Sequence, residues 1–93
     1  MSLLKPVIRT ERFDIFHHVV ERNPSLGVPK DVYEAWFHSE DVPRSVCEVT
    51  IWKSKSFGNY VEWCHVCEQY RRQGIATEVM RAIENHVGEL AIN

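Results

Sequence analysis

Residues 60–87 constrain the fold more than any other part of the chain. An apolar, strand-like run (60–66) leads into a basic loop with one glycine, and an amphipathic segment follows the loop. In that segment an apolar residue recurs at every fourth position, which is the period of one helix face. The pattern predicts a helix over residues 73–87, ended by Gly88. The residues on this face are Ile75, Val79, Ile83 and Val87, with Ala76 and Met80 beside them.

The loop between this strand and this helix has the features of an anion site. Arg71 and Arg72 precede Gly74, which has no Cβ and lets a ligand approach the backbone closely. The first N–H groups of a helix have no partner within the helix, and the helix dipole favours negative charge there. We therefore expect the loop to hold an anion, and our hypothesis is the pyrophosphate of a cofactor.

Length and composition indicate one ordinary globular domain. The chain has 93 residues, which fits a single domain over residues 1–93. Its 44% hydrophobic and 26% charged residues are typical of a folded protein rather than a disordered one. The net charge of −2 gives no sign of a broad nucleic-acid or membrane surface, so any anion site must be local.

Three features bear on the compartment. The chain has no apolar run long enough to span a membrane, and residues 1–6 lack the apolar core of a signal peptide. Three cysteines, Cys47, Cys64 and Cys67, are an odd number that fits reduced thiols better than a disulfide framework. We expect a cytoplasmic protein.

Hydrophobic periodicity predicts two helices in the first half of the chain. Over residues 10–22 the apolar residues fall on one half of a helical wheel, and Thr10 is a suitable N-cap. Residues 23–27 end that helix, and Pro29 suits the first turn of a second. A short strand over residues 6–9 is also expected. The predicted apolar faces contain Phe13, Ile15, Phe16, Val19 and Val20 in the first helix and Val32, Tyr33, Trp36 and Phe37 in the second.

A two-stranded hairpin follows a loop over residues 39–45. Residues 46–53 and 60–66 are rich in β-branched and aromatic residues, which favours strands, and residues 54–59 read as the turn between them. Both strands carry apolar residues on both faces, so we expect a sheet covered on both sides. Residues 89–93 could begin a further strand.

The run Val66-Cys67-Glu68-Gln69-Tyr70-Arg71-Arg72-Gln73-Gly74-Ile75-Ala76 resembles the central motif of the GNAT superfamily of acyl-CoA-dependent N-acetyltransferases. That motif is a strand, then Arg/Gln-x-x-Gly-x-Gly/Ala, then a helix, and the resemblance extends over residues 60–87. It implies an α+β fold with an antiparallel sheet flanked by helices. It also implies acetyl-CoA as co-substrate, an amine as acyl acceptor and direct transfer without a metal.

The resemblance also implies residue roles. In the family the backbone of this loop binds the acyl-CoA pyrophosphate, and a strand N–H near Val66 polarises the acyl carbonyl. Glu62 lies where many members have the general base, although a polar residue on a sheet face is the simpler interpretation. The residues that the resemblance assigns to the cofactor are Val66, Cys67, Arg71, Arg72, Gln73, Gly74, Ile75, Ala76 and Thr77.

The chain departs from the family pattern in two places. We predict two strands between the second helix and the motif where the family has three, and the sequence ends soon after the motif helix, where the family continues with further strands. Those strands complete the cofactor gap in the family. The alternative function is therefore a non-catalytic, truncated or degenerate domain that binds CoA or a protein partner. An incomplete sheet edge would favour a homodimer.

Other residues have structural interpretations beside functional ones. Cys64-x-x-Cys67 with Cys47 and a histidine could bind zinc, but small packed thiols are the simpler interpretation. Trp52 and Trp63 could line a substrate cleft or pack in the sheet. His17 and His18 are expected at the surface. A small nucleic-acid module using the arginine loop lacks a broad basic face. The acyl acceptor cannot be derived from the sequence.

Overall fold

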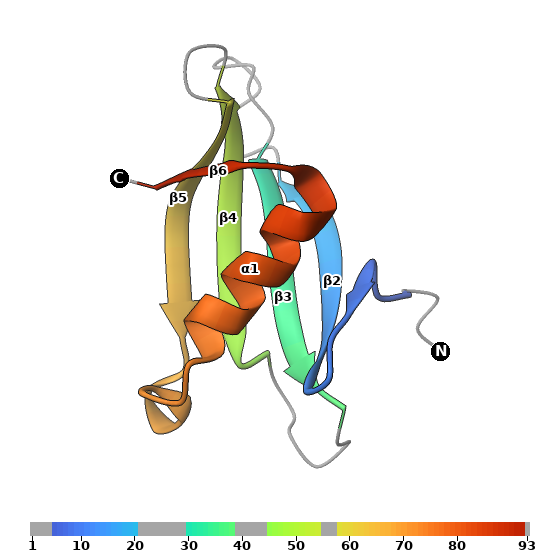
Figure 1. The fold of residues 1–93 in the computed structure, drawn as a ribbon, viewed down its shortest axis with the longest axis vertical. Helices are drawn as coiled ribbons and strands as arrows, with labels where there is room; N and C mark the ends of the chain where they lie inside the picture. The colour runs from blue at the N-terminus through green and yellow to red at the C-terminus, as the bar shows by residue number, and fades with distance from the viewer. Residues whose placement is uncertain (1–4, 21–29, 39–44, 55–57, 93) are drawn as a thin grey trace.

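Six strands form a single sheet in the order β1-β2-β3-β4-β5-β6. The computed structural model describes residues 5–20, 30–38, 45–54 and 58–92. Strands β1 to β5 are antiparallel neighbours, and β6 adds to β5 in parallel. Figure 1 shows α1 lying diagonally across one face of this sheet, so the predicted α+β class is confirmed. The elements are β1 (Ile8–Arg9), β2 (Phe13–Val20), β3 (Lys30–Phe37), β4 (Cys47–Ser54), β5 (Gly58–Val66), the 3₁₀ helix η1 (Glu68–Tyr70), α1 (Ile75–Val87) and β6 (Leu90–Ile92).

The second half of the chain forms the predicted elements. The expected strands 46–53 and 60–66 correspond to β4 and β5, and the expected helix 73–87 is α1, which begins at Ile75. Gly88 follows α1 with φ 102°, and its N–H donates to the Glu84 carbonyl at 2.8 Å. The expected strands at the two ends of the chain are β1 and β6. Residues 23–27, which were predicted to end the first helix, lie outside the described residues. So do residues 39–44 of the predicted loop (39–45) and residues 55–57 of the predicted turn (54–59).

The two predicted N-terminal helices are wrong, because these segments are β2 and β3. In β2 the side chains alternate, so Phe13 and Ile15 are buried beneath α1 while Phe16 points to the other face. The other face mixes apolar and polar residues, and it is this mixture that imitates a helical pattern. Five antiparallel strands therefore precede the motif where the sequence predicted three, including the short strand at residues 6–9.

Thr10 shows why the start of β2 resembles the start of a helix. Its hydroxyl accepts hydrogen bonds from the N–H groups of Arg12 (3.3 Å) and Phe13 (3.0 Å), as an N-cap hydroxyl would. Here the same contacts close the turn between β1 and β2. Cross-strand pairing then outweighs helix propensity, because both edges of β2 find partners in β1 and β3.

The hydrophobic core lies between α1 and one face of the sheet. Ile75, Val79 and Ile83 on α1 are at most 2% exposed, as the helical period predicts. Complete burial of such side chains stabilises the fold by about 1.5–3 kcal/mol each. The other buried residues of this core are Phe13, Ile15, Tyr33, Ala35, Val46, Cys47, Val49, Ile51, Val61 and Leu90.

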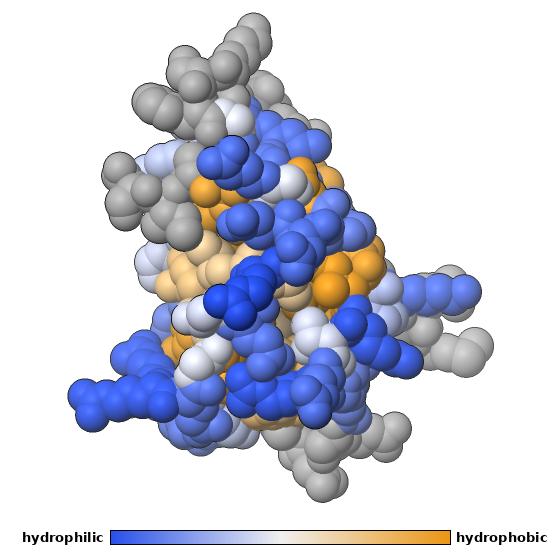
Figure 2. Space-filling view, viewed as in Figure 1, coloured by the Kyte–Doolittle hydropathy of each residue, from blue (hydrophilic) through white to orange (hydrophobic). Residues whose placement is uncertain are grey.

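The outer face of α1 is polar. Figure 2 shows it as a hydrophilic band that crosses the molecule, with hydrophobic residues on either side. Among the described residues no helix is long and apolar enough to cross a membrane.

The opposite face of the sheet carries no described helix, so the expected cover on both faces is not found among the described elements. The registers place Glu34, Glu48 and His65 in one cross-strand row on this face. The next row contains His18, Val32, Thr50 and Trp63, and Trp63 is 56% exposed. A β-bulge between Thr50 and Ile51 places Glu62 opposite no residue of β4.

Candidate functional site

The loop between β5 and α1 contains two residues in the left-handed backbone conformation. Arg72 has φ 68°, and Gly74, the N-cap residue of α1, has φ 71° and ψ 14°. A non-glycine residue in this region costs about 1–2 kcal/mol, so the conformation at Arg72 is held by its surroundings. Tyr70 helps to hold it, because its N–H donates to the Cys67 carbonyl (2.9 Å) and its ring lies edge-on to Phe37.

This loop delivers the start of α1 with its N–H groups open. The first bond of the helix joins the Glu78 N–H to the Gly74 carbonyl at 3.0 Å. The N–H groups of Ile75, Ala76 and Thr77 therefore have no carbonyl partner within the helix. No side chain among the described residues caps Gly74, and nothing lies within 4 Å of where its Cβ would be. An anion can approach this backbone without meeting a side chain.

Two arginines give the loop positive charge. Arg71 Nε donates to the Val66 carbonyl at 3.0 Å, which holds the guanidinium beside the end of β5. Arg72 is exposed and makes no ion pair with any described residue. Both guanidinium groups are therefore available to phosphate oxygens.

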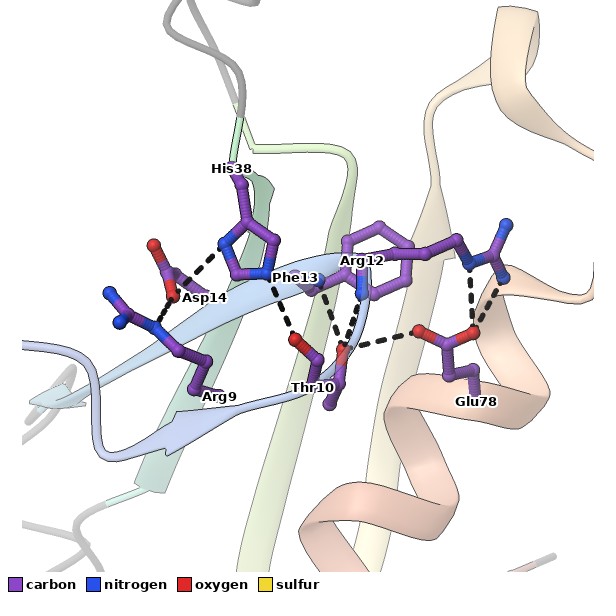
Figure 3. Close-up of polar contacts among 7 residues, drawn as sticks. All are labelled: Arg9, Thr10, Arg12, Phe13, Asp14, His38 and Glu78. Atoms are coloured by element: carbon purple, nitrogen blue, oxygen red, sulfur yellow. Dashed lines mark hydrogen bonds and ion pairs between the residues drawn. The ribbon is translucent and has the colours of Figure 1, made fainter.

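The one acidic side chain in the first turn of α1 is neutralised (Figure 3). Arg12 Nη2 and Nε both lie 2.8 Å from Glu78 Oε1, and the Thr10 hydroxyl donates to Glu78 Oε2 at 3.2 Å. Arg12 Nη2 also donates to the Gln73 carbonyl at 3.5 Å. The turn before β2 thus fixes both the helix start and the loop, and it offsets a charge that would repel an anion.

A cavity of about 360 Å³ lies against this helix start. Seven of the nine residues that the sequence assigned to a cofactor line it. Cys67 and Gln73 do not: Cys67 lines a neighbouring cavity and its Sγ donates to the Ser45 carbonyl at 3.3 Å. We call the first cavity the phosphate-loop cavity; it is lined by Cys64, His65, Val66, Tyr70, Arg71, Arg72, Gly74, Ile75, Ala76 and Thr77.

The end of β5 has a free edge beside this cavity. Strand β6 pairs with residues 59–61 of β5 and with no later described residue of that strand. The Cys67 N–H points to β4, where it donates to the Val46 carbonyl at 2.9 Å. Because N–H directions alternate along a strand, the N–H groups of Val66 and Cys64 point to the free edge.

Cys64 has a thiol whose pKa is lowered by a neighbouring residue. It is exposed at the free edge, and Cys47 on β4 is buried beside it. The hydrogen bond that Cys47 donates lowers the pKa of Cys64 to about 7 against a smaller opposing effect of burial. The same contact raises the pKa of Cys47, and burial adds to that rise.

Glu62 lies in a different cavity, on the sheet face opposite α1. This open-face groove has a volume of about 740 Å³, and within it Lys30 Nζ lies 2.7 Å from the Glu62 carboxylate. Of the groove residues, His65 also lines the phosphate-loop cavity, so it connects the two faces at the end of β5. Its ring stacks on Trp63 at 6.0 Å between centroids. The groove is lined by His18, Val20, Lys30, Val32, Glu48, Thr50, Glu62, Trp63 and His65.

Sequence reasoning missed the roles of Arg12, Cys64 and His65 in this arrangement. The alternation of β5 puts Cys64 and His65 on opposite faces next to the motif, which was a usable signal. The sequence around Arg12 contains no such signal, because 61 positions separate Arg12 from the Gln73 carbonyl that it contacts. His17 was expected at the surface, yet it is half-buried with Nε2 2.8 Å from Asp31. Among the described residues no group of three or more His, Cys, Asp or Glu could hold a metal ion.

Together these features define an α+β domain in which an uncapped helix start lies beside a free strand edge. A family model described as "Acetyltransferase (GNAT) family" matches residues 17–93. The chain therefore belongs to the GNAT acetyltransferase family, whose members are acyl-CoA-dependent acetyltransferases. A search of curated proteins and a search of solved structures gave no match.

The residues present fit the pyrophosphate of the family's acetyl-CoA. The helix start offers open N–H groups, Gly74 leaves room above the backbone, and Arg72 is an unpaired cation among the described residues. A doubly charged pyrophosphate group needs donors and positive charge in a small volume, and this loop supplies both.

Proposed function

We propose that this chain binds acetyl-CoA in the phosphate-loop cavity and transfers the acetyl group to an amine. The observation that carries the proposal is the pair of left-handed residues, Arg72 and Gly74, in the loop that leads into the open N–H groups of α1. The pyrophosphate would accept hydrogen bonds from Ile75, Ala76 and Thr77 and would pair with the two arginines.

The free edge of β5 supports the next part of the proposal. The N–H groups of Val66 and Cys64 point away from β4, and a pantetheine amide chain can pair with such an edge as an added strand does. An N–H at this edge would polarise the acyl carbonyl and stabilise the oxyanion that forms when the amine attacks.

Proton removal from the attacking amine has two candidates. Glu62 is held by Lys30 at 2.7 Å, and this ion pair opposes its use as a base. His65 lines both cavities, so an amine in the open-face groove would meet His65 before it reaches the cofactor. We therefore propose His65 as the general base and Glu62 with Lys30 as part of the acceptor groove.

Calorimetry with acetyl-CoA tests the binding step. We expect the wild type to bind and Arg71→Ala and Gly74→Glu each to bind at least ten-fold more weakly, because each removes a phosphate contact or fills the cradle. Arg9→Ala is the matched control, since Arg9 is an exposed arginine paired with Asp14 away from the loop. No binding by the wild type at millimolar ligand would refute the proposal.

Turnover is tested with a panel of amines and a measurement of CoA release. His65→Gln should lower the release rate and flatten its pH profile, and it should change acetyl-CoA affinity much less than the rate. Glu62→Gln should change the apparent affinity for the amine more than the maximal rate. The reverse result would assign the base to Glu62.

A non-catalytic CoA-binding domain is the second candidate. The Lys30–Glu62 pair favours it, because the carboxylate expected to act as base is already engaged. It predicts acetyl-CoA binding with no CoA release for any amine. The free edge of β5 also supports the proposal of a homodimer, because an unpaired strand edge can pair with a second chain. Sedimentation at several concentrations, with and without acetyl-CoA, tests this proposal.

A further inference from the structure

Cys64 lines the cavity in which we propose that acetyl-CoA binds. It lines the phosphate-loop cavity together with Val66 and Ala76, and it is exposed. Its N–H points to the same free edge of β5 that we propose for the pantetheine arm. The same cavity therefore contains both Cys64 and the start of α1.

A second thiol supports Cys64 from within the sheet. The register pairs Cys47 with Val66 and Val49 with Cys64, so the two cysteines are diagonal neighbours on the face beneath α1. Cys47 is 1% exposed and cannot meet a ligand, but its thiol lies beside Cys64 and lowers the pKa of Cys64. A buried donor beside an exposed thiol stabilises the thiolate form of the exposed thiol.

We propose that Cys64 accepts the acyl group of bound acyl-CoA and becomes an S-acyl-cysteine. The Cys64 thiolate attacks the thioester carbonyl, a bond forms between Sγ and the acyl carbon, and the bond from that carbon to the CoA sulfur breaks. CoA leaves as a thiolate and takes up the equivalent of the proton that Cys64 released. One thioester replaces another, so the step needs no further reactant. The inference rests on the proposed function for its ligand.

The surroundings of Cys64 determine the pH at which this reaction runs. Its charged neighbours are Arg71 and Arg72, which line the phosphate-loop cavity with it, and Arg81 and Glu84 on α1. The other titratable groups beside it are His65 and Tyr70 in the phosphate-loop cavity and Cys47 on β4. With the pKa of Cys64 lowered to about 7, the thiolate fraction rises about ten-fold between pH 6 and pH 8. The acylation rate should follow that fraction.

Mass spectrometry of the full chain incubated with acetyl-CoA tests the inference. We expect one acetyl group per chain, assigned to Cys64 by peptide mapping and removed by neutral hydroxylamine, which cleaves thioesters and not amides. Cys64→Ser should lose this label. Cys67→Ser should keep it, because the Cys67 thiol donates a hydrogen bond to the Ser45 carbonyl and does not line the phosphate-loop cavity. Cys47→Ala should slow labelling and shift its pH profile upward.

Calorimetry on the same samples separates this inference from the proposed function. If acetyl-CoA binds and Cys64 stays unlabelled at pH 8, the role of Cys64 as acyl acceptor is refuted and the proposed function stands. If the hydroxylamine-sensitive label is on Cys67, or only lysines are labelled, the inference is also overturned. If acetyl-CoA does not bind, both fall together. Should Cys64→Ser fail to fold, alkylation of wild-type Cys64 with iodoacetamide before acetyl-CoA is added must prevent the label.

Discussion

The guanidinium of Arg12 lies 2.8 Å from the carboxylate of Glu78, and this contact joins the turn before β2 to the first turn of α1 (Figure 3). The two residues are 66 positions apart in the chain. Their contact neutralises the acidic side chain in the first turn of α1, which would otherwise oppose an anion at the helix start.

Replacement of Arg12 by Gln should therefore weaken CoA binding by about two- to five-fold, because the negative charge of Glu78 beside the phosphate site is no longer offset. Pantetheine, which lacks the pyrophosphate, should bind equally well to both proteins. Calorimetry with the two ligands measures the difference, and Arg9→Gln provides a control of equal charge change. An equal loss for both ligands would mean that Arg12 acts only by supporting the fold.

Replacement of Arg72 by Gly should separate stability from binding. Arg72 has φ 68°, which glycine adopts without strain, so the free energy of unfolding should stay the same or rise by up to about 1 kcal/mol. CoA binding should weaken, because the loop loses a cation. Urea denaturation and calorimetry give the two values; a marked loss of stability would show that the Arg72 side chain has a structural contact.

Replacement of Ile83 by Val should lower the free energy of unfolding by about 0.5–1.5 kcal/mol, because Ile83 is 0% exposed between α1 and the sheet. Val19→Thr is the control, since Val19 is 54% exposed and threonine keeps the β-branched shape. We expect the control to change stability by less than about 0.5 kcal/mol. Urea denaturation at one pH compares the three proteins.

Stability should fall in acid partly through Asp14. The hydrogen bond from Arg9 at 2.7 Å lowers the pKa of Asp14 below 3.8, and His38 adds to the effect. A carboxyl whose pKa is lower in the folded state stabilises the fold above its unfolded pKa. That stability is lost as the pH falls through the folded value. Asp14→Asn should therefore flatten the dependence of unfolding free energy on pH below about 4. An unchanged slope would contradict this assignment.

The sequence determined the motif half of the fold by itself. The four-residue period of Ile75, Val79 and Ile83 required a helix with one buried face, and Gly74 required a loop that permits positive φ. These are local properties, since they follow from side-chain spacing and from the missing Cβ of glycine. The position of the phosphate-loop cavity was predictable for the same reason.

Only the tertiary structure decided the identity of β2 and β3. Their residues satisfy both a helical and an alternating pattern, and pairing with β1 and β4 selects the strand. Tertiary structure also brought Arg12 to Glu78, Cys47 to Cys64 and Lys30 to Glu62. Each pair lies on two different elements, so no local preference encodes it. The sheet register and the packing of α1 bring the partners together.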